Sequence, residues 1–543
     1  MFMNRKARGK KRRQRYCCSD TTGGVTKAET GQAGGEVRLE QTLGLFSSTT
    51  IVAGSMIGSG IFLVAAEIAR ITQSAWLFLA AWVVTAAMTM IGALCYGELA
   101  AMMPKAGGQY VYLREALGPL WGFLYGWTLF LVIQTGTIAA VCVGFGKFLG
   151  VFFPGISSSH WLWHIAHVPV VQVGPVALGN MEIGVNTANL AGLLLVILLA
   201  AINALGVRLG ALVQNVFTTA KGLSLLAMVA LGLTVGRHAA AMKANFGAGM
   251  EAGWTKLHPL VTGANGATTM VSVVVLLAVV QVGSLFSADA WNNVTFTAGE
   301  VKNPQRNLPL SLALGTGSVL TLYFLISLAY LLVLPLHGDP HGTTVMARGI
   351  AYATDDRVGT AVLEAIFPGV GTALMALAIL ISGFGCANGM TLAGARVYYA
   401  MSQDGLFFRS VGRLHRRTKT PVAGLAVQAA WTVLLCISGS FGQLLDYVIF
   451  AVLVFYILTI AGLMVLRVKR PDAERPYRAV GYPVLPVIYI VMATWICIVL
   501  LRYKQQYTWP GLGIVLLGIP VYFFWTRRGR GLPPREHPLL ENC

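Results

Sequence analysis

Charged side chains are scarce in this chain. Asp, Glu, Lys and Arg together make up 11% of the residues, whereas hydrophobic residues make up 56%. This composition excludes an ordinary soluble domain, in which about a quarter of the residues are charged. Acidic residues are the rarer sign, with 21 against 40 basic residues. The basic residues gather between apolar runs and in the tails, as in membrane proteins, so we expect no nucleic-acid partner.

The sequence also lacks the patterns of metal, cofactor and catalytic sites. The eight cysteines include no Cys-x-x-Cys pair and join no cluster with histidine, so we expect neither a metal site nor a cofactor. The residues His160, His164, His167 and His258 lie in predicted loops without metal-ligand spacing, and no activated nucleophile accompanies them. The sequence therefore predicts a protein that is not an enzyme.

Long apolar runs are abundant. We count twelve, each of about 20 residues, the length that a helix needs to cross a bilayer. The predicted spans are 43–69, 76–100, 120–149, 185–205, 209–235, 268–298, 308–334, 369–399, 422–438, 444–465, 484–501 and 511–525. A basic tail at 1–42, predicted to be disordered, and a short tail at 526–543 flank them. Because Lys and Arg gather in alternate connecting segments, we expect both termini in the cytoplasm and the protein in the cell membrane.

Small residues interrupt the first run at its middle. Gly54, Ser55, Gly58, Ser59 and Gly60 fall within seven residues, and glycine weakens a helix. A helix that breaks here leaves carbonyl groups on one side and amide groups on the other, which suit the ammonium and carboxylate of an amino acid. The alternative is a close contact between two unbroken membrane helices through small residues.

A second interruption lies in the sixth span, where 284–293 reads Ser-Leu-Phe-Ser-Ala-Asp-Ala-Trp-Asn-Asn. An ionised Asp289 is costly at this depth, so such a residue usually faces a cavity or a partner. Spans one and six stand five apart. This is the relation expected of two five-helix halves of opposite topology with a binding site between them.

Several short motifs follow one another along the chain. They are Gly-Ser-Gly-Ile-Phe at 58–62, Tyr-Gly-Glu-Leu at 96–99, Pro-Lys-Ala-Gly-Gly-Gln-Tyr at 104–110, the stretch from Trp291 to Glu300, Asn-Pro-Gln-Arg-Asn-Leu-Pro at 303–309, Asp-Gly at 404–405, Arg-Pro-Tyr-Arg at 475–478 and Gly-Tyr-Pro at 481–483. With this ordered set the chain resembles the amino acid–polyamine–organocation superfamily, in particular the L-type amino acid transporter branch and its bacterial relatives. The resemblance covers nearly all of 43–525.

The resemblance implies an all-α, leucine-transporter-like fold with helices one and six broken. Ten core helices are expected at 43–465, as one half at 43–235 and an inverted half at 268–465, followed by two further helices within 466–525. It also implies alternating access to an amino acid held at the two breaks.

The resemblance further implies which residues bind the substrate. The ammonium is expected at carbonyls near Met56, Ile57 and Phe286, and the carboxylate at the amides of Ser59, Gly60 and Ile61. The other predicted lining or supporting residues are Gly58, Ser287, Asp289, Trp291, Asn292 and Asn388. Phe286 is expected to act as an aromatic gate, and for each aromatic residue the alternative is ordinary helix packing.

Lys221 lies midway along the fifth span, about 20 Å from either end, which is too far for the side chain to reach water. A lysine at this depth is a functional candidate. In the resembling family a lysine here takes the place of the sodium ion of sodium-driven relatives and links spans one and five. Its ammonium is expected to donate to carbonyls freed at the first break. A permanently charged strut and a proton carrier remain alternative interpretations.

Other charges have more than one interpretation. Relatives that carry cystine and dibasic amino acids place an aspartate at the position of Asp289, so a cationic substrate is one interpretation and a neutral one the other. Glu300, with Lys302 and Arg306 nearby, is expected to act as a cytoplasmic gate or charge clamp, or else to end a solvated helix. Glu67 and Arg70 are expected to form a local ion pair.

The loop at 152–183 contains no cysteine. In the animal members of the resembling family a cysteine in this loop bonds a glycoprotein partner, so we expect no disulfide-linked heavy subunit here. The predicted function is that of a sodium-independent amino acid permease, working as an exchanger or as a proton symporter. The alternatives are a sodium-coupled symporter of the same fold and an amino acid sensor that does not transport.

Overall fold

The computed structural model describes residues 39–169, 171–173, 176–178, 181–247, 249, 254, 257–262, 267–438 and 441–528. The predicted disordered tail at 1–42 lies almost entirely outside the described residues, as does most of the tail at 526–543.

The helices of the first half begin and end close to the predicted spans. They are α1 (Leu45–Met56), α2 (Gly60–Thr72), α3 (Ala75–Met102), α4 (Gln109–Leu117), α5 (Pro119–Thr128), the π-helix η1 (Leu129–Ile133), α6 (Gln134–Leu149), α7 (Thr187–Ala204) and α8 (Val207–Leu233). Polar caps mark where two apolar runs become helical. The Ser74 side chain accepts a hydrogen bond from the Leu77 amide before α3, and Asn186 accepts one from Asn189 before α7.

The second half follows after α9 (Ala239–Phe246). It contains α10 (Val273–Ser287), α11 (Asn293–Phe296), η3 (Ala298–Glu300), α12 (Pro304–Val333), α13 (Val345–Arg348), η4 (Thr354–Asp356), α14 (Val358–Ile366), α15 (Gly371–Gln403), η5 (Arg409–Gly412), α16 (Val422–Ser438) and α17 (Phe441–Lys469). The last two helices are α18 (Val484–Tyr503) and α19 (Gln505–Arg528).

Within the described residues, nine helices are long and apolar enough to cross a membrane. The pair α1 and α2 also qualifies as one bent span, and α10 and α16 are shorter apolar helices. Each predicted span therefore corresponds to an apolar helix or helix pair. The count of twelve crossings stays a prediction, because the two shorter helices do not reach full span length.

The all-α expectation omitted three short antiparallel hairpins, all in connecting segments. β1 (Trp161–Val168) pairs with β4 (Met181–Asn186), β2 (Val171–Val173) with β3 (Val176–Leu178), and β5 (His258–Thr262) with β6 (Ala267–Val271). The first two hairpins lie in the connecting segment between α6 and α7. Strand β6 instead occupies the start of the predicted sixth span, 268–298, so the helix of that span begins only at Val273. In each hairpin, pairing between strands satisfies backbone groups that are not part of a helix.

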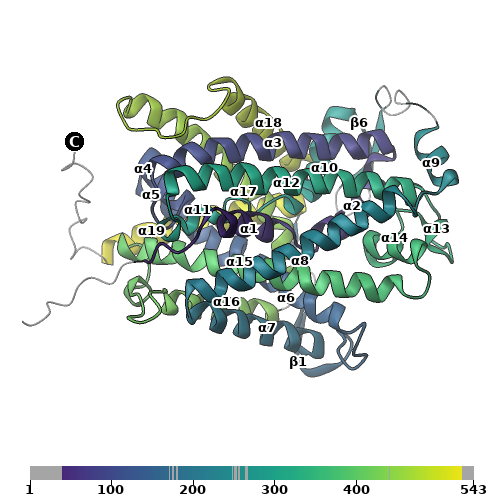
Figure 1. The fold of residues 1–543 in the computed structure, drawn as a ribbon, viewed down its shortest axis with the longest axis horizontal. Coiled ribbons are helices and arrows are strands. Elements are labelled where there is room, and N and C mark those ends of the chain that lie inside the picture. The colour runs from purple at the N-terminus through teal and green to yellow at the C-terminus, as the bar shows by residue number, and fades with distance from the viewer. Residues whose placement is uncertain are drawn as a thin grey trace, which may run out of the picture. The chain divides into compact units, whose positions relative to one another are not determined.

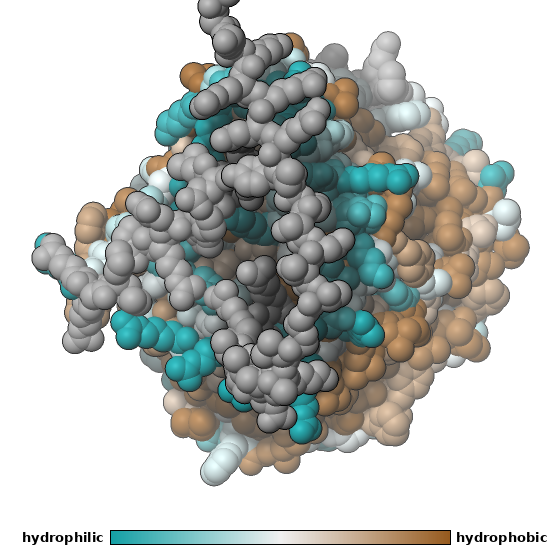
Figure 2. Space-filling view, turned by 60° about the vertical axis from the view of Figure 1, so that its left-hand side comes forward, coloured by the Kyte–Doolittle hydropathy of each residue, from teal (hydrophilic) through white to brown (hydrophobic). Residues whose placement is uncertain are grey.

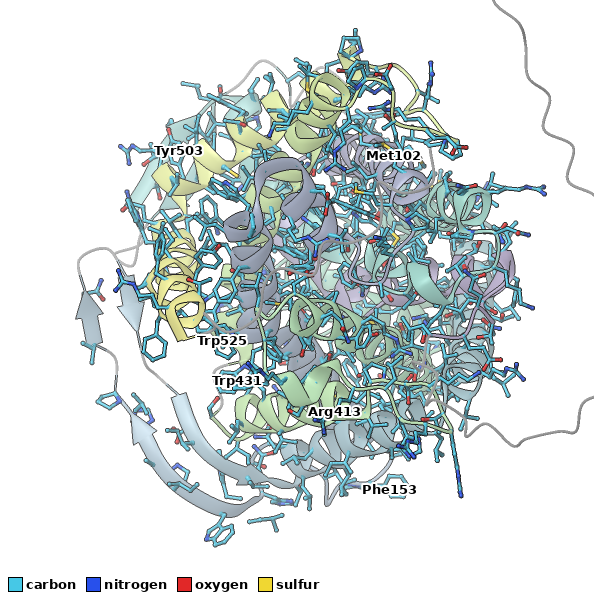
Figure 3. The ribbon with its side chains drawn as sticks, turned by 90° about the vertical axis from the view of Figure 1, so that its left-hand side faces the viewer. Met102, Phe153, Arg413, Trp431, Tyr503 and Trp525 are labelled. Atoms are coloured by element: carbon cyan, nitrogen blue, oxygen red, sulfur yellow. The ribbon has the colours of Figure 1, made fainter. Side chains whose placement is uncertain are left out.

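The interrupted helix α1 lies inside the bundle, where it packs against α8, α12 and α15, while α2 packs against α10 (Figure 1). Figure 1 places α9, α13 and β6 at one end of the bundle and α4, α11 and the last part of α19 at the other. Figure 2 shows an apolar flank beside the hydrophilic side chains of the second end. Figure 3 looks along the helices from this second end, where Met102 ends α3 and Trp525 lies near the end of α19.

Close packing at Gly54 yields the first prediction. A methyl group at Gly54 would collide with the side chains of Gln214 and Thr218 on α8. We expect Gly54→Ala to lower the free energy of unfolding by about 1–3 kcal/mol through overpacking, measured by thermal unfolding in detergent. The control is Gly222→Ala in α8, where the added methyl meets nothing within 4 Å. Equal stability of the two variants would contradict this account of how α1 meets α8.

Candidate functional site

The break in the first span lies at Ile57–Ser59. Helix α1 ends at Met56, α2 begins at Gly60, and the two are bent by 42°. Ile57 has extended backbone angles (φ −75°, ψ 91°), so the helical hydrogen-bond ladder stops there. The break is therefore present where the sequence predicts it.

The carbonyl groups at the end of α1 already have donors. The Met56 carbonyl accepts from the Gly58 amide (2.9 Å) and from the Tyr323 hydroxyl (3.0 Å). The Ile57 carbonyl accepts from Lys221 (2.7 Å) and from the Ser382 hydroxyl (3.0 Å). A carbonyl oxygen has two lone pairs, so an incoming ammonium would have to displace a donor from either group. The Phe286 carbonyl similarly accepts from the amides of Ala288 and Asp289.

The amide groups on the other side of the break are different. Those of Ser59, Gly60 and Ile61 donate to no acceptor among the described residues, and they form the N-terminus of the 13-residue helix α2. The aligned peptide dipoles and free amides of such a helix end favour an anion. This half of the predicted site is thus open to a carboxylate.

The second break adjoins the first. Helix α10 ends at Ser287, and the chain runs without helix to Asn292 before α11 begins. A Cβ atom at Gly60 would lie 2.6 Å from the Ser287 hydroxyl oxygen and 3.2 Å from its Cα. Only glycine allows the start of α2 to approach the end of α10 so closely.

A cavity of about 600 Å³ opens between the two breaks, within the size range of small-molecule sites. Of the predicted residues, its lining includes Met56, Gly58, Ser59, Gly60, Phe286, Ser287, Asp289 and Asn292. It also includes residues that sequence reasoning missed, among them Gln109, Tyr125, Gln134, Cys386 and Tyr456. Gln109 lies within the Pro-Lys-Ala-Gly-Gly-Gln-Tyr motif, which could have signalled it, whereas the other four sit in apolar runs without a distinguishing pattern.

The third span contributes a π-helical turn to this cavity. The turn is η1, and its end residues Leu129 and Ile133 both line the cavity. Such turns interrupt α-helices frequently at functional sites, because the extra residue shifts the side chains that follow. No sequence signal predicted it.

Asp289 is the charged lining residue that lies at the level of the breaks. Its carboxylate accepts a hydrogen bond from the Tyr456 hydroxyl (2.6 Å), and no ion pair to it occurs among the described residues. Of the other charged lining residues, Lys147 lies in the last turn of α6, and Asp355 and Arg357 lie between α13 and α14, with Arg357 over the Phe148 ring of α6. An acceptor without a basic partner in a half-apolar cavity suits a cationic group of a ligand.

Four predicted binding residues lie outside the cavity lining, namely Ile57, Ile61, Trp291 and Asn388. Trp291 packs edge-on against Tyr96 (centroids 4.7 Å apart) and at a tilt against the lining residue Tyr456 (5.2 Å). Asn388 is fully buried on α15, where it donates to Gln214 (2.9 Å) and accepts from Asn203 (2.9 Å). The side chains of Trp291 and Asn388 are satisfied by packing and by helix-to-helix hydrogen bonds, which fits the supporting alternative better than the lining one, and their part in binding stays a prediction.

Asn292 has a supporting contact as well as a place in the lining. Its side-chain amide donates to Gln109 (2.8 Å), and Gln109 donates in turn to Thr459 (3.0 Å). This chain of amide and hydroxyl groups links the second break to α4 and α17.

Lys221 is 1% exposed and reaches the first break from α8. Its ammonium donates to the carbonyls of Gly54 (2.5 Å) and Ile57 (2.7 Å). The predicted contact between span five and the broken end of span one is therefore present. No acidic side chain pairs with this ammonium among the described residues, so carbonyl oxygens alone hold the charge.

Glu300 pairs with an arginine of a distant helix and not with the nearby Lys302 or Arg306, and its role as a gate or charge clamp stays a prediction. It forms a two-pronged ion pair with Arg396 of α15, Nε to Oε2 and Nη2 to Oε1 at 3.0 Å each, and both side chains are almost completely buried. A buried carboxylate needs a buried cation, and Arg396 is the arginine that lies inside a span. The Glu300 backbone carbonyl also accepts from the Thr42 and Leu43 amides, which fastens the chain before α1.

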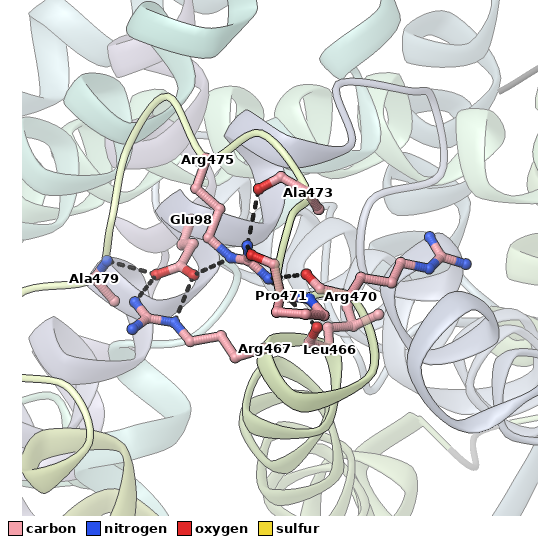
Figure 4. A network of polar contacts seen from close by, with 8 residues as sticks. All are labelled: Glu98, Leu466, Arg467, Arg470, Pro471, Ala473, Arg475 and Ala479. Atoms are coloured by element: carbon pink, nitrogen blue, oxygen red, sulfur yellow. Dashed lines mark hydrogen bonds and ion pairs between the residues drawn. The ribbon is translucent and has the colours of Figure 1, made fainter. Parts of the chain in front are cut away.

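A second ionic network joins motifs that are far apart in the sequence. Buried Glu98 of α3 accepts from Arg467 (2.9 and 2.5 Å) and from the Ala479 amide (2.6 Å), and Arg475 lies 3.4 Å away (Figure 4). Arg475 itself donates to backbone carbonyls of the turn that follows α17 (Figure 4). The network ties α3 to α17 and to the segment before α18.

The local pair expected of Glu67 and Arg70 is wrong. Arg70 instead pairs with Asp356 (2.6 Å), and Glu67 lies 3.7 Å from Lys504. Both partners come from distant segments, which the spacing of three residues in the helix did not reveal.

Comparison with known proteins gives a consistent result. The model of the family described as amino acid permease matches residues 43–520. The chain is 28% identical over 491 residues to the b(0,+)-type amino acid transporter 1 of Mus musculus, covering 90% of this chain and 88% of the relative. It is 29% identical over 514 residues to the large neutral amino acids transporter small subunit 2 of Mus musculus, covering 94% of this chain and 86% of the relative.

The buried ion pair yields the second prediction. Glu300→Ala leaves the Arg396 guanidinium buried without a counter-charge, and we expect a loss of about 3–5 kcal/mol in the free energy of unfolding, measured by thermal unfolding in detergent. The double variant E300L/R396L should lose less than the single variant. The control is Arg70→Ala, which breaks a half-exposed pair and should cost at most about 1 kcal/mol. A single variant as stable as this control would contradict the assignment.

Proposed function

The chain belongs to the amino acid permease family, and we propose that it moves amino acids across the cell membrane by alternating access without using sodium. The proposed ligand of the site is an amino acid, and the protein is embedded in the lipid bilayer. The observation that carries the proposal is the contact of Lys221 with the broken end of α1, beside a cavity where two interrupted helices meet.

Sodium independence is inferred from the ligands of that ammonium. Sodium is held by oxygen ligands, and carbonyl groups at a helix break are the usual ones in transporters of this kind. The Lys221 ammonium already uses the Gly54 and Ile57 carbonyls and supplies a positive charge of its own. A sodium ion at the same place would face a like charge with no anionic ligand to offset it.

The cavity lining and the ion pairs at the two ends of the bundle support a conformation in which the cavity is open on one side of the membrane. The cavity lining extends to Ser158, Asp355 and Arg357 in the connecting segments near α13. At the opposite end, the Glu300–Arg396 and Glu98–Arg467 pairs lie between the helices, and Asp404 pairs with Arg114. With both termini in the cytoplasm, as the basic loops predict, the open side is the external one.

The proposal includes no disulfide-linked heavy subunit. One relative is named a small subunit. In this chain the segment 152–183 has no cysteine, and the five cysteines within the described residues, Cys95, Cys142, Cys386, Cys436 and Cys497, are all buried.

Flux measurements test the function. We expect purified protein in liposomes to release preloaded labelled amino acid when unlabelled amino acid is added outside, with equal rates in sodium and in choline buffer. Repetition with a pH gradient separates exchange from proton symport.

Lys221→Ala should lower the rate at least about a hundredfold while leaving the elution profile of the protein unchanged, because α1 loses its link to α8. Sodium-dependent flux, or an unchanged rate for Lys221→Ala, would refute the proposal, and binding without flux would indicate a sensor.

The substrate class is proposed from Asp289. Since the break carbonyls are occupied, this carboxylate is the acceptor available to a cationic group at the level of the breaks. A hydrogen bond to a charged group contributes about 1.5–3 kcal/mol, so Asp289→Asn should weaken substrate binding about ten- to hundredfold. Competition with unlabelled lysine and leucine is the measurement. A selective loss for lysine assigns Asp289 to the side chain of a dibasic substrate, an equal loss assigns it to the α-ammonium, and no loss refutes a binding role.

A further inference from the structure

The segment between α15 and α16 is unusually basic. Arg409, Arg413, Arg416 and Arg417 are all exposed, and none of them forms an ion pair with a described residue. No acidic residue occurs from position 405 to 445. Glu40, the acidic side chain that reaches this segment, is already shared by Arg208 (2.5 Å) and Lys419 (3.4 Å). The positive charge of the four arginines is therefore not offset within this part of the protein.

The basic segment is held in one conformation by α15. The Ser402 hydroxyl donates to the Phe408 carbonyl (2.7 Å), and the Gln403 side chain donates to the Gly412 carbonyl (2.6 Å). Between these contacts the chain forms the short helix η5. The arginines thus project from a formed surface, so binding requires little ordering of the backbone.

Aromatic residues mark the depth of this surface relative to the bilayer. The Trp525 indole donates to the Gly405 carbonyl (3.2 Å), and its ring lies 5.2 Å from that of Phe408. Phe408 is 51% exposed and Phe524 is 55% exposed. Trp and other aromatic rings at the end of a membrane helix sit at the level of the lipid headgroups. Figure 3 shows Arg413 and Trp525 from this end of the bundle.

We propose that Arg409, Arg413, Arg416 and Arg417, together with the Phe408–Trp525 pair, bind the phosphate groups of anionic phospholipids in the adjoining leaflet. The guanidinium groups recognise phosphate through paired hydrogen bonds and charge. In this arrangement the acyl chains cover the exposed side chains of Phe408 and Phe524. A soluble anion or a nucleic acid would leave these side chains uncovered. Juxtamembrane clusters of this size attract anionic lipid with about 1 kcal/mol per basic residue, or about fivefold in affinity.

The test measures lipid binding and not transport, so it is independent of the proposed function. The full-length protein is purified in detergent with phosphatidylglycerol or phosphatidylcholine, and the retained lipid is counted by native mass spectrometry. We expect preferential retention of phosphatidylglycerol, and a loss of this preference by at least about tenfold in R409Q/R413Q/R416Q/R417Q. The control is R237Q/K243Q, which removes two exposed charges near α9 at the other end of the bundle. Equal retention by wild type and the quadruple variant would overturn the proposal, and so would an equal loss in the control.

A second measurement locates the lipid. Phosphatidylglycerol brominated near the headgroup should quench part of the tryptophan fluorescence of the wild-type protein in bilayers. This part should disappear in Trp525→Phe and in the quadruple arginine variant, and it should be smaller with brominated phosphatidylcholine. Quenching that is unchanged in both variants would place the lipid elsewhere and overturn the proposal.

Discussion

One buried ammonium group links the interrupted helix α1 to the continuous helix α8. Lys221 comes from α8, a continuous helix, and its side chain satisfies two carbonyls at the point where α1 stops. A peptide carbonyl without a donor is costly inside a bilayer, and so is a lysine without an acceptor. Here the Lys221 ammonium supplies the donor that the carbonyls lack, and the carbonyls supply the acceptors that the ammonium needs. The break in α1 can therefore exist at this depth because Lys221 is there, and Lys221 can be buried because α1 is broken.

The rest of the site follows from that arrangement. Lys221 of α8 binds the end of α1. After the break, α2 starts at Gly60, which lies in close contact with Ser287 at the end of α10. Ser59 and Gly60, where α2 begins, and Asp289 line the same cavity. A positive helix end and a carboxylate face one cavity, which is the arrangement that a zwitterion or a cationic amino acid requires.

Opposite charges are distributed unevenly between the ends of the bundle. At the end near α4 they are buried or half-buried and paired between distant helices, as in Glu300–Arg396 and Glu98–Arg467. At the end near α13 the pairs are more exposed, as in Arg70–Asp356 and Arg357–Asp355, and Asp355 and Arg357 also line the cavity. Buried pairs hold helices in a definite arrangement more than they add stability, because desolvation offsets much of their attraction. This asymmetry supports the proposed state, in which the end near α4 is closed and the end near α13 is open.

The sequence by itself determined the membrane class, the position of nearly every long helix and the first break. These features depend on local properties, namely the length of apolar runs and the helix-weakening effect of glycine. The sequence also marked Lys221 as a functional candidate, because a charge in mid-membrane is costly, and the family resemblance implied its link to span one. Only the tertiary structure decided the partners of Glu300 and Arg70, the place of Trp291 and Asn388 outside the cavity lining, and the entry of Gln109 and Tyr456 into that lining. These depend on which side chains of distant helices face one another, and a pattern of apolar residues along one chain does not carry that information.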